Sequence, residues 1–195
     1  MQHNINNFNL SNNIDNYDSV FKIIKDKIPV SIFSIVNLNF FKTIIEEKII
    51  EVFLIKKNQE TVSVITVATI QNLYKLKKRF IFYLITHPYK IFANFSFLLK
   101  SIGRDEYDNN FKKNQSLHLL HLVIFKNYFV DISKKDKDKI LDTFFKKIIK
   151  KYNANSFFLC YEKKNVKAHY FYKRNNFKIY KEKDNKIFVS KEFNL

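Results

Sequence analysis

The spacing of apolar residues in the first third of the chain changes from a helical to an extended period. Apolar residues three and four positions apart predict helices over residues 18–27 and 31–47. Two runs of β-branched and aromatic residues follow, over 49–56 and 61–68. The polar tetrapeptide 57–60 between them predicts an antiparallel hairpin.

Residues 69–104 form an apolar, aromatic stretch that Pro88 divides, and we predict helices over 70–86 and 88–102. A membrane-spanning helix needs about 20 uninterrupted apolar residues, and basic residues interrupt both pieces. We therefore expect no integral membrane span. The two helices could lie on a membrane surface or under a substrate cleft, but burial against a sheet is the favoured interpretation.

Strands and helices alternate in the rest of the chain. After a polar loop over 105–115, the pattern predicts strands over 116–125, 155–161, 177–182 and 186–191, with helices over 136–152 and 164–174. This order predicts an α/β domain of the α+β type, with a mixed, mostly antiparallel sheet and helices on both faces. We expect strands 116–125 and 155–161 to be neighbours and parallel at their starts, joined by a right-handed crossover.

The two ends of the chain differ in composition. Residues 1–17 are rich in asparagine and poor in core-forming side chains, so they predict a disordered or frayed tail. Residues 18–195 are expected to form a single domain, because 46% of the whole chain is apolar.

The formal net charge is +17, a value that by itself suggests a nucleic acid or an anionic surface as partner. Nearly all of the cations are lysines, and glycine occurs once, a skew that an AT-rich coding sequence produces whatever the protein does. Arginine, the residue best suited to phosphates and base edges, is scarce. A nucleic-acid partner is therefore disfavoured.

Asparagine must take the turn positions that glycine usually occupies, because it tolerates a positive φ angle better than most residues. We expect such turns at 58–59, 175–176 and 184–185.

Residues that bind metals or carry thiol chemistry are scattered. Cys160 is the only cysteine, which excludes an intramolecular disulfide and fits a reducing, cytoplasmic compartment. It has no base at a suggestive spacing, so we expect a buried, inert thiol. His, Cys, Asp and Glu show no metal-ligand spacing, and no metal is expected.

The segment with the most specific pattern is a strand over 156–161 followed by Asn-x-x-Ala-x-x-Phe-Tyr at 165–172 and by Phe177. Asn165 is suited to cap the helix, and Ala168 and Tyr172 share one helix face. The segment resembles the closing segment of the GNAT superfamily of acyl-CoA-dependent N-acyltransferases, and a weaker resemblance covers residues 31–182. It implies that Tyr172 protonates the departing CoA sulfur, that Asn165 contacts the pantetheine arm, and that Ala168 leaves room for it. The alternative is an ordinary aromatic core.

The resemblance also implies that residues 117–123 are the central CoA-binding strand, with Leu122 and Val123 beside the cofactor. In the superfamily a Gln/Arg-x-x-Gly-x-Gly/Ala loop follows, whereas residues 126–135 contain no glycine. Ser133, Lys134 and Lys135, with the amides at the start of the next helix, could still hold the CoA diphosphate. Alternatively, the loop has lost the cofactor.

His118 and His121 are the candidates for a general base, because histidine titrates near neutral pH. They lie three positions apart on one predicted strand, so we expect them on opposite faces, with only one directed into the cleft. A half-buried structural histidine is the alternative.

Three hypotheses for the function remain open. The resemblance implies an N-acetyltransferase that moves an acyl group from acetyl-CoA to a primary amine of a small molecule or sugar, by direct attack in a ternary complex. A catalytically silent GNAT-fold module would instead bind a partner or an anionic surface through its lysines. A basic nucleic-acid-binding protein is the third hypothesis. The sequence does not define the oligomeric state.

Overall fold

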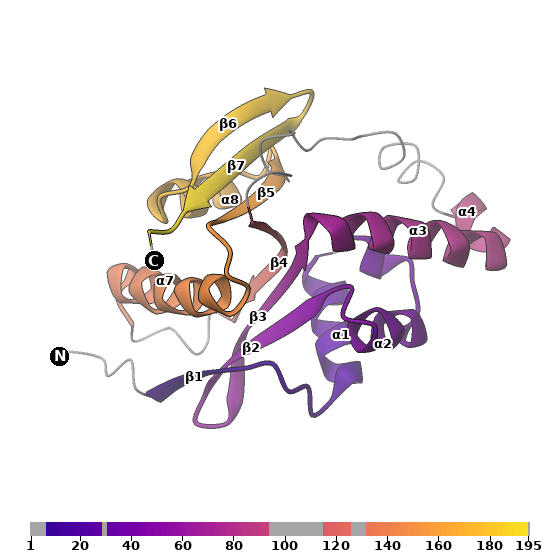
Figure 1. Ribbon diagram of the computed structural model, residues 1–195, viewed down its shortest axis with the longest axis horizontal. Coiled ribbons are helices and arrows are strands. Elements are labelled where there is room, and N and C mark those ends of the chain that lie inside the picture. Colours follow the sequence, from indigo (N-terminus) through magenta and orange to yellow (C-terminus); the bar gives the residue numbers. More distant parts are fainter. Residues whose placement is uncertain (1–6, 29–30, 94–114, 126–131, 195) are drawn as a thin grey trace.

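Seven strands form one sheet in the computed structural model, which describes residues 7–28, 31–93, 115–125 and 132–194 (Figure 1). The order across the sheet is β1-β2-β3-β4-β5-β7-β6. Only β4 and β5 pair in parallel, and the other neighbours are antiparallel. The strands are β1 Phe8–Ser11, β2 Glu51–Lys57, β3 Glu60–Thr69, β4 Ser116–Ile124, β5 Ser156–Glu162, β6 Lys178–Lys183 and β7 Lys186–Glu192.

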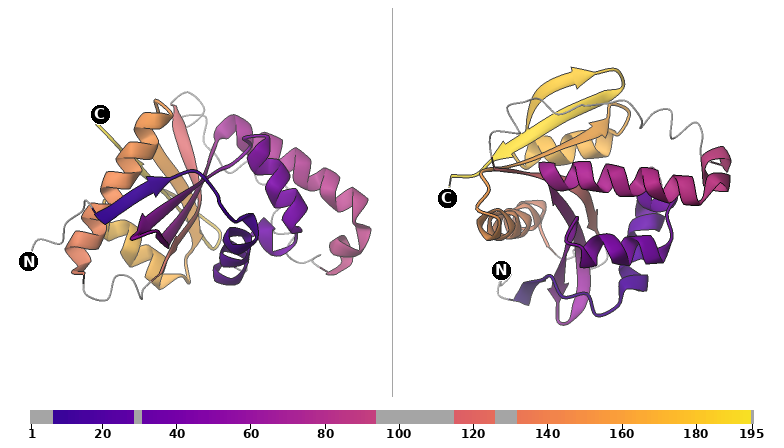
Figure 2. Two further views of the ribbon diagram at one scale, coloured as in Figure 1. Left: turned by 90° about the horizontal axis from the view of Figure 1, so that it is seen from below. Right: turned by 45° about the vertical axis from the view of Figure 1, so that its right-hand side comes forward.

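Helices cover both faces of the sheet, as the sequence predicts (Figures 1 and 2). One face carries α1 Tyr17–Lys27, the short 3-10 turn η2 Ile32–Ser34, α2 Leu38–Glu46 and α3 Ile70–Thr86, all of which contribute to one apolar cluster. The other face carries α7 Lys134–Lys151 and α8 Val166–Arg174 over a second cluster. We call these the α1–α3 face and the α7–α8 face.

Helix α7 holds the second cluster together. Its apolar residues recur at helical spacing and are fully or almost fully buried against the sheet, and they are Ile140, Leu141, Phe144, Phe145, Ile148 and Ile149. Truncating a buried phenylalanine of this kind to alanine destabilises a protein by about 3–5 kcal/mol. The helix therefore fixes the position of the β4–α7–β5 unit.

Asparagine, glutamine and aspartate have the positive φ angles in the tight turns, at the positions where turns are expected. In the β2–β3 hairpin, Asn58 and Gln59 have φ angles of 49° and 70°, the positive values that a two-residue hairpin turn requires. Asn176 after α8 has a φ of 63°, and Asp184 between β6 and β7 has a φ of 51°. These turns are formed without glycine.

The expectation of a frayed N-terminal tail is wrong for residues 8–11, which form β1. Their backbone pairs with β2, from Phe8 opposite Lys57 to Ser11 opposite Leu54. The Phe8 side chain is buried in the cluster on the α7–α8 face, and Lys56 forms an ion pair with Asp15 at 2.8 Å. Pairing with the edge of β2 thus orders a segment whose own composition favours disorder.

The helix predicted over 31–47 is interrupted. The 3-10 turn ends at Ser34, and α2 begins only at Leu38, after Asn37 accepts a hydrogen bond from the Phe40 N–H at 2.9 Å. The helix predicted over 88–102 is described only as α4 Pro88–Ala93, and its remainder lies outside the described residues, as does nearly all of the loop predicted over 105–115. No helix in the described part of the chain is long and apolar enough to cross a bilayer.

Candidate active site

The two central strands separate shortly after they begin. Strands β4 and β5 are paired only over Ser116–His118 and Ser156–Phe158. Beyond these residues β4 continues its pairing with β3, and β5 continues its pairing with β7. The prediction of neighbouring strands that are parallel at their starts is confirmed. Two side-chain contacts join the paired residues. The Ser116 and Ser156 hydroxyl oxygens lie 2.8 Å apart, and the stacked rings of His118 and Phe158 have centroids 4.8 Å apart.

A β-bulge in β4 places both candidate bases on one face. Thr66 of β3 lies opposite His121, but the next residue, Val67, lies opposite Leu119, so Leu120 is an extra residue in β4. Leu119 and Leu122 pack into the cluster on the α7–α8 face, and the two residues between them lie on the α1–α3 face. The prediction that His118 and His121 face opposite sides is therefore wrong, because it assumed unbroken alternation.

His121 is held by the first turn after α1. Its Nε2 atom lies 2.7 Å from the Ser31 hydroxyl, and its ring packs against Phe33 at 4.9 Å. Burial lowers the pKa of His121 from 6.5 to about 3. Its Nδ1 atom is buried and has no hydrogen-bond partner among the described residues, and the same holds for the Thr66 hydroxyl on the opposite strand. This part of the α1–α3 face thus contains two unpaired polar atoms.

His118 is the second buried histidine of β4. Burial, with smaller contributions from His121 and Lys186, lowers its pKa from 6.5 to about 3. Both histidines are consequently neutral at neutral pH. Each can accept a proton, although a general base works best with a pKa near the working pH.

Tyr172 lies on the α7–α8 face. Its ring stacks on Tyr161 of β5 at 5.5 Å and meets the edge of Phe177 at 5.1 Å. Burial, with smaller contributions from Tyr161 and Cys160, raises the pKa of Tyr172 well above its ordinary value of 10. The hydroxyl therefore keeps its proton at neutral pH, as a proton donor must.

The two local predictions around Tyr172 are confirmed. The Asn165 side-chain oxygen accepts a hydrogen bond from the Ala168 N–H at 3.0 Å and so caps α8. Ala168 and Tyr172 both pack against the cluster on the α7–α8 face, so they share a side of the helix. Asn165 itself is exposed at the start of α8.

The sequence reasoning missed a polar contact between Tyr161, which stacks on Tyr172, and His169. The Tyr161 hydroxyl lies 3.1 Å from Nδ1 of His169, the residue that follows Ala168 on α8. Burial, with a contribution from Glu182, raises the pKa of Tyr161. No sequence spacing relates a strand residue to one particular position on the following helix, so this pair could be found only in three dimensions.

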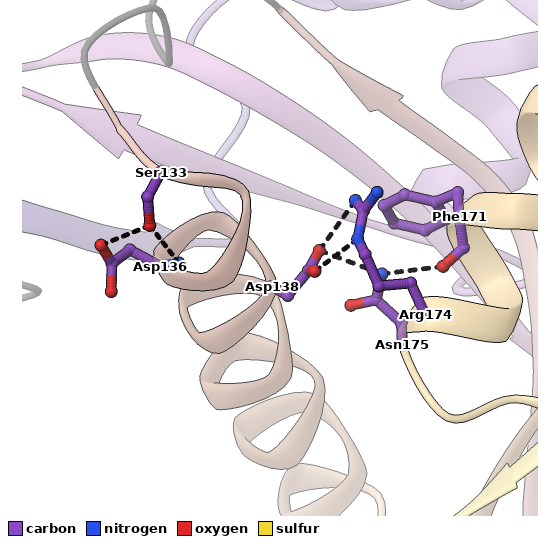
Figure 3. Close-up of polar contacts among 6 residues, drawn as sticks. All are labelled: Ser133, Asp136, Asp138, Phe171, Arg174 and Asn175. Atoms are coloured by element: carbon purple, nitrogen blue, oxygen red, sulfur yellow. Dashed lines mark hydrogen bonds and ion pairs between the residues drawn. The ribbon is translucent and has the colours of Figure 1, made fainter.

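The start of α7 lies two residues earlier than predicted, because Ser133 caps the helix. The Ser133 hydroxyl accepts a hydrogen bond from the Asp136 N–H at 3.1 Å and donates one to the Asp136 carboxylate at 2.7 Å (Figure 3). Lys134 and Lys135 are therefore exposed in the first helical turn rather than in a loop. Ile132, just before the cap, is buried in the cluster on the α7–α8 face, and Phe129 lies outside the described residues.

Helix α7 and the end of α8 border a basic groove of about 1070 Å³. Asp138 binds the Arg174 guanidinium through both carboxylate oxygens and also accepts a hydrogen bond from Asn175, as Figure 3 shows. Basic residues outnumber acidic ones in the lining, and they are Lys134, Lys135, Lys139, Lys146, Arg174, Lys178 and Lys191 against Asp138, Asp142 and Glu192.

The structure groups some predicted site residues and separates others. Because Asp138 reaches the end of α8, the lysines at the start of α7 lie toward the opposite end of α8 from Asn165, roughly 13 Å along the helix. Leu122 packs into the cluster on the α7–α8 face and Val123 into the one on the α1–α3 face. The candidate residues therefore follow an extended path around the separation of β4 and β5.

The seven-stranded sheet, with helices on both faces and two central strands that separate, is the fold of the GNAT acetyltransferases. The structure is similar to the Campylobacter jejuni N-acetyltransferase PseH in complex with acetyl coenzyme A, with a TM-score of 0.53, 17% identity, and coverage of 95% of this chain and 98% of that one. A Listeria monocytogenes GNAT acetyltransferase matches with a TM-score of 0.56, 8% identity and 95% coverage of each chain. The PaiA N-acetyltransferase of Thermoplasma acidophilum in complex with coenzyme A matches with a TM-score of 0.52, 13% identity, and coverage of 95% and 99%.

No protein-family model matches the sequence, and no curated protein sequence does. The likeness is therefore one of fold, and the GNAT-like fold expected from residues 156–177 is confirmed.

Among the described residues, no group of three or more His, Cys, Asp or Glu side chains is close enough to hold a metal ion.

Proposed function

We propose that this protein is an N-acetyltransferase that transfers the acetyl group of acetyl-CoA to a primary amine of a small molecule or amino sugar. The observation that carries the proposal is the separation of β4 and β5, with Tyr172 on one face of the sheet and the buried pair His118 and His121 on the other. A thioester held between the two strands would have a proton donor toward its sulfur and proton acceptors toward the incoming amine.

The chain's own groups fit the two proton transfers of this reaction. Acetyl-CoA supplies the activated acyl group and leaves as a free thiol. Tyr172 would give its proton to the sulfur as the carbon–sulfur bond breaks, because its raised pKa keeps it protonated at neutral pH. When His121 donates its Nε2 proton to Ser31, its unpaired Nδ1 would accept the proton that the amine loses. Exchange with solvent would then restore both groups.

The remaining candidates would hold the carrier. Leu122 and Val123 would flank the pantetheine arm along β4, and Asn165 and Ala168 would border it at the start of α8. Ser133, Lys134 and Lys135 would bind the diphosphate through charge and through the positive end of the α7 dipole. Asp136 opposes this, because its carboxylate lies against the same cap. The single thiol Cys160 is consistent with a reducing, cytoplasmic compartment for the reaction.

The experiment is a ligand-shift measurement followed by an assay. Acetyl-CoA at a hundredfold excess over its dissociation constant should stabilise the folded protein by about 2.7 kcal/mol. Thiol release from acetyl-CoA, followed across a panel of amines and amino sugars, should then depend on the amine. If neither acetyl-CoA nor free CoA stabilises the protein, the proposal is rejected.

A catalytically silent binding module is the second candidate. The glycine-free segment 126–135 and the Asp136 carboxylate at the start of α7 favour it, since both oppose close approach of a diphosphate. Stabilisation by CoA without thiol release for any amine would support this candidate over the enzyme.

A further inference from the structure

Exposed apolar side chains gather on two consecutive helices. Nine large apolar residues of the described chain are exposed, and six of them belong to α3 and α4, namely Tyr74, Ile81, Phe82, Ile85, Tyr89 and Phe92. Their exposed fractions reach 63% for Phe82, 66% for Ile85 and 84% for Phe92. The surface of a soluble protein usually carries exposed apolar residues singly, so this cluster of six marks an interaction surface.

All of these residues except Tyr74 belong to the second half of α3 and to α4. Helix α3 leaves the sheet at the end of β3 and extends away from it, with α4 at its far end (Figures 1 and 2). The opposite side of α3 is buried through Leu76, Phe80, Tyr83 and Leu84, which anchor the helix on the α1–α3 face. We call the exposed set Ile81, Phe82, Ile85, Tyr89 and Phe92 the apolar tip.

A band of positive charge adjoins the apolar tip. Lys75, Lys77 and Lys78, in the preceding turns of α3, are exposed and form no ion pair within the described part of the chain. Arg79 is paired with Glu47 of α2 at 2.5 Å. The sequence has no acidic residue between Glu60 and Asp105, so α3 and α4 carry no negative side chain of their own. We call Lys75, Lys77 and Lys78 the lysine band.

The charge decides which partner fits this surface. A second copy of the chain would bring an identical lysine band, on a protein of net charge +17, against the first, and like charges repel. An anionic lipid surface matches both parts. Apolar and aromatic side chains enter the boundary between headgroups and acyl chains, and lysines reach the lipid phosphates.

We propose that α3 and α4 dock the protein on an anionic membrane surface, with the apolar tip inserted below the headgroups and the lysine band against them. The protein then lies on the bilayer without crossing it. This binding is independent of acetyl transfer, because none of the candidate site residues belongs to α3 or α4.

The absence of tryptophan from the chain permits a clean probe of insertion. Phe92→Trp places a single tryptophan in the apolar tip, and Tyr170→Trp places one at a similarly exposed aromatic position on α8. With vesicles of equal parts phosphatidylcholine and phosphatidylglycerol, the emission of the Phe92→Trp protein should shift to shorter wavelength. The emission of the Tyr170→Trp protein should stay unchanged, and phosphatidylcholine vesicles alone should shift neither.

Charge variants test the lysine band. Replacing Lys75 and Lys78 by Gln in the Phe92→Trp protein should weaken vesicle binding about 30-fold at low salt. Each lysine near an anionic surface strengthens binding about five- to sixfold, and the two factors multiply. The matched change of Lys167 and Lys173 to Gln on α8 should have little effect. Added salt should weaken the parent protein more than the Lys75 and Lys78 variant.

Five results would overturn the proposal, the first four of them measured with vesicles or with the protein alone. These four are no shift with any vesicle, an equal shift with phosphatidylcholine alone, an equal shift for the Tyr170→Trp protein, and a shift without vesicles that grows with protein concentration. The last would assign the surface to a second copy. An equally large shift with soluble polyglutamate would assign it to an acidic protein partner and would also overturn the lipid proposal.

Discussion

Mild acid should destabilise this protein through the two buried histidines of β4. In the folded state the pKa of His118 and of His121 is about 3, whereas the ordinary value is 6.5. Between these two pH values the unfolded chain binds protons that the folded chain does not, so stability falls as the pH falls below 6.5. The direction is opposite to that of a histidine held in an ion pair.

The size of the effect follows from the same two values. A pH of about 5 lies roughly 1.5 units below the ordinary histidine pKa of 6.5. Each unit corresponds to about 1.4 kcal/mol, so each histidine should remove about 2 kcal/mol of folding free energy. Both together should remove about 4 kcal/mol between pH 8 and pH 5. That is a large share of the 5–15 kcal/mol typical of a folded domain.

Urea unfolding followed by far-ultraviolet circular dichroism at about pH 8 and about pH 5 measures this difference, and the chosen range stays above the ordinary carboxyl pKa values. His121→Asn should reduce the loss to about 2 kcal/mol. His169→Asn, on α8 and only partly buried, should leave the loss near its full value. Equal stability at the two pH values, or an unchanged pH dependence in His121→Asn, would falsify the reasoning from burial.

Three further outcomes are expected. Tyr172→Phe should lower acetyl-transfer turnover about 10²-fold while acetyl-CoA affinity holds, and an unchanged rate with lower thermal stability would instead assign the ring to the core. Changing Lys134 and Lys135 to Ala should weaken CoA binding at least about tenfold and flatten its salt dependence, whereas an unchanged affinity in titration calorimetry contradicts a charge-held diphosphate. Asn165→Ala should lower the free energy of unfolding by about 1 kcal/mol through loss of the α8 cap, and Asn165→Ser should restore most of it.

Local patterns predicted the elements that local forces determine. The helix expected over 70–86 is found as Ile70–Thr86, because Thr69 caps its start through the Asn72 N–H and Pro88 follows its end. The hairpin and its Asn58–Gln59 turn were likewise readable from β-branched runs around a polar link. In the candidate site, the cap at Asn165 depends on one local side-chain hydrogen bond, and the shared face of Ala168 and Tyr172 depends on helical periodicity.

The features that were missed depend on contacts between distant segments. The bulge at Leu120 is set by the register with β3, which the sequence of β4 alone does not determine. Strand β1 gains its order from pairing with β2 across more than 40 residues of sequence. Pairing of Tyr161 with His169 likewise requires α8 to be placed on the sheet before it can be recognised.

The bulge at Leu120 gives the two layers of the molecule unequal sensitivity to acid. It turns His121 toward the same face of the sheet as His118, where His121 contacts Ser31 and Phe33 on the α1–α3 side. Protonation of His121 should therefore loosen the packing of Ser31 and Phe33 against β4 before the packing of α7 and α8 is affected. Amide hydrogen exchange would register this as a subglobal opening confined to one side of the sheet.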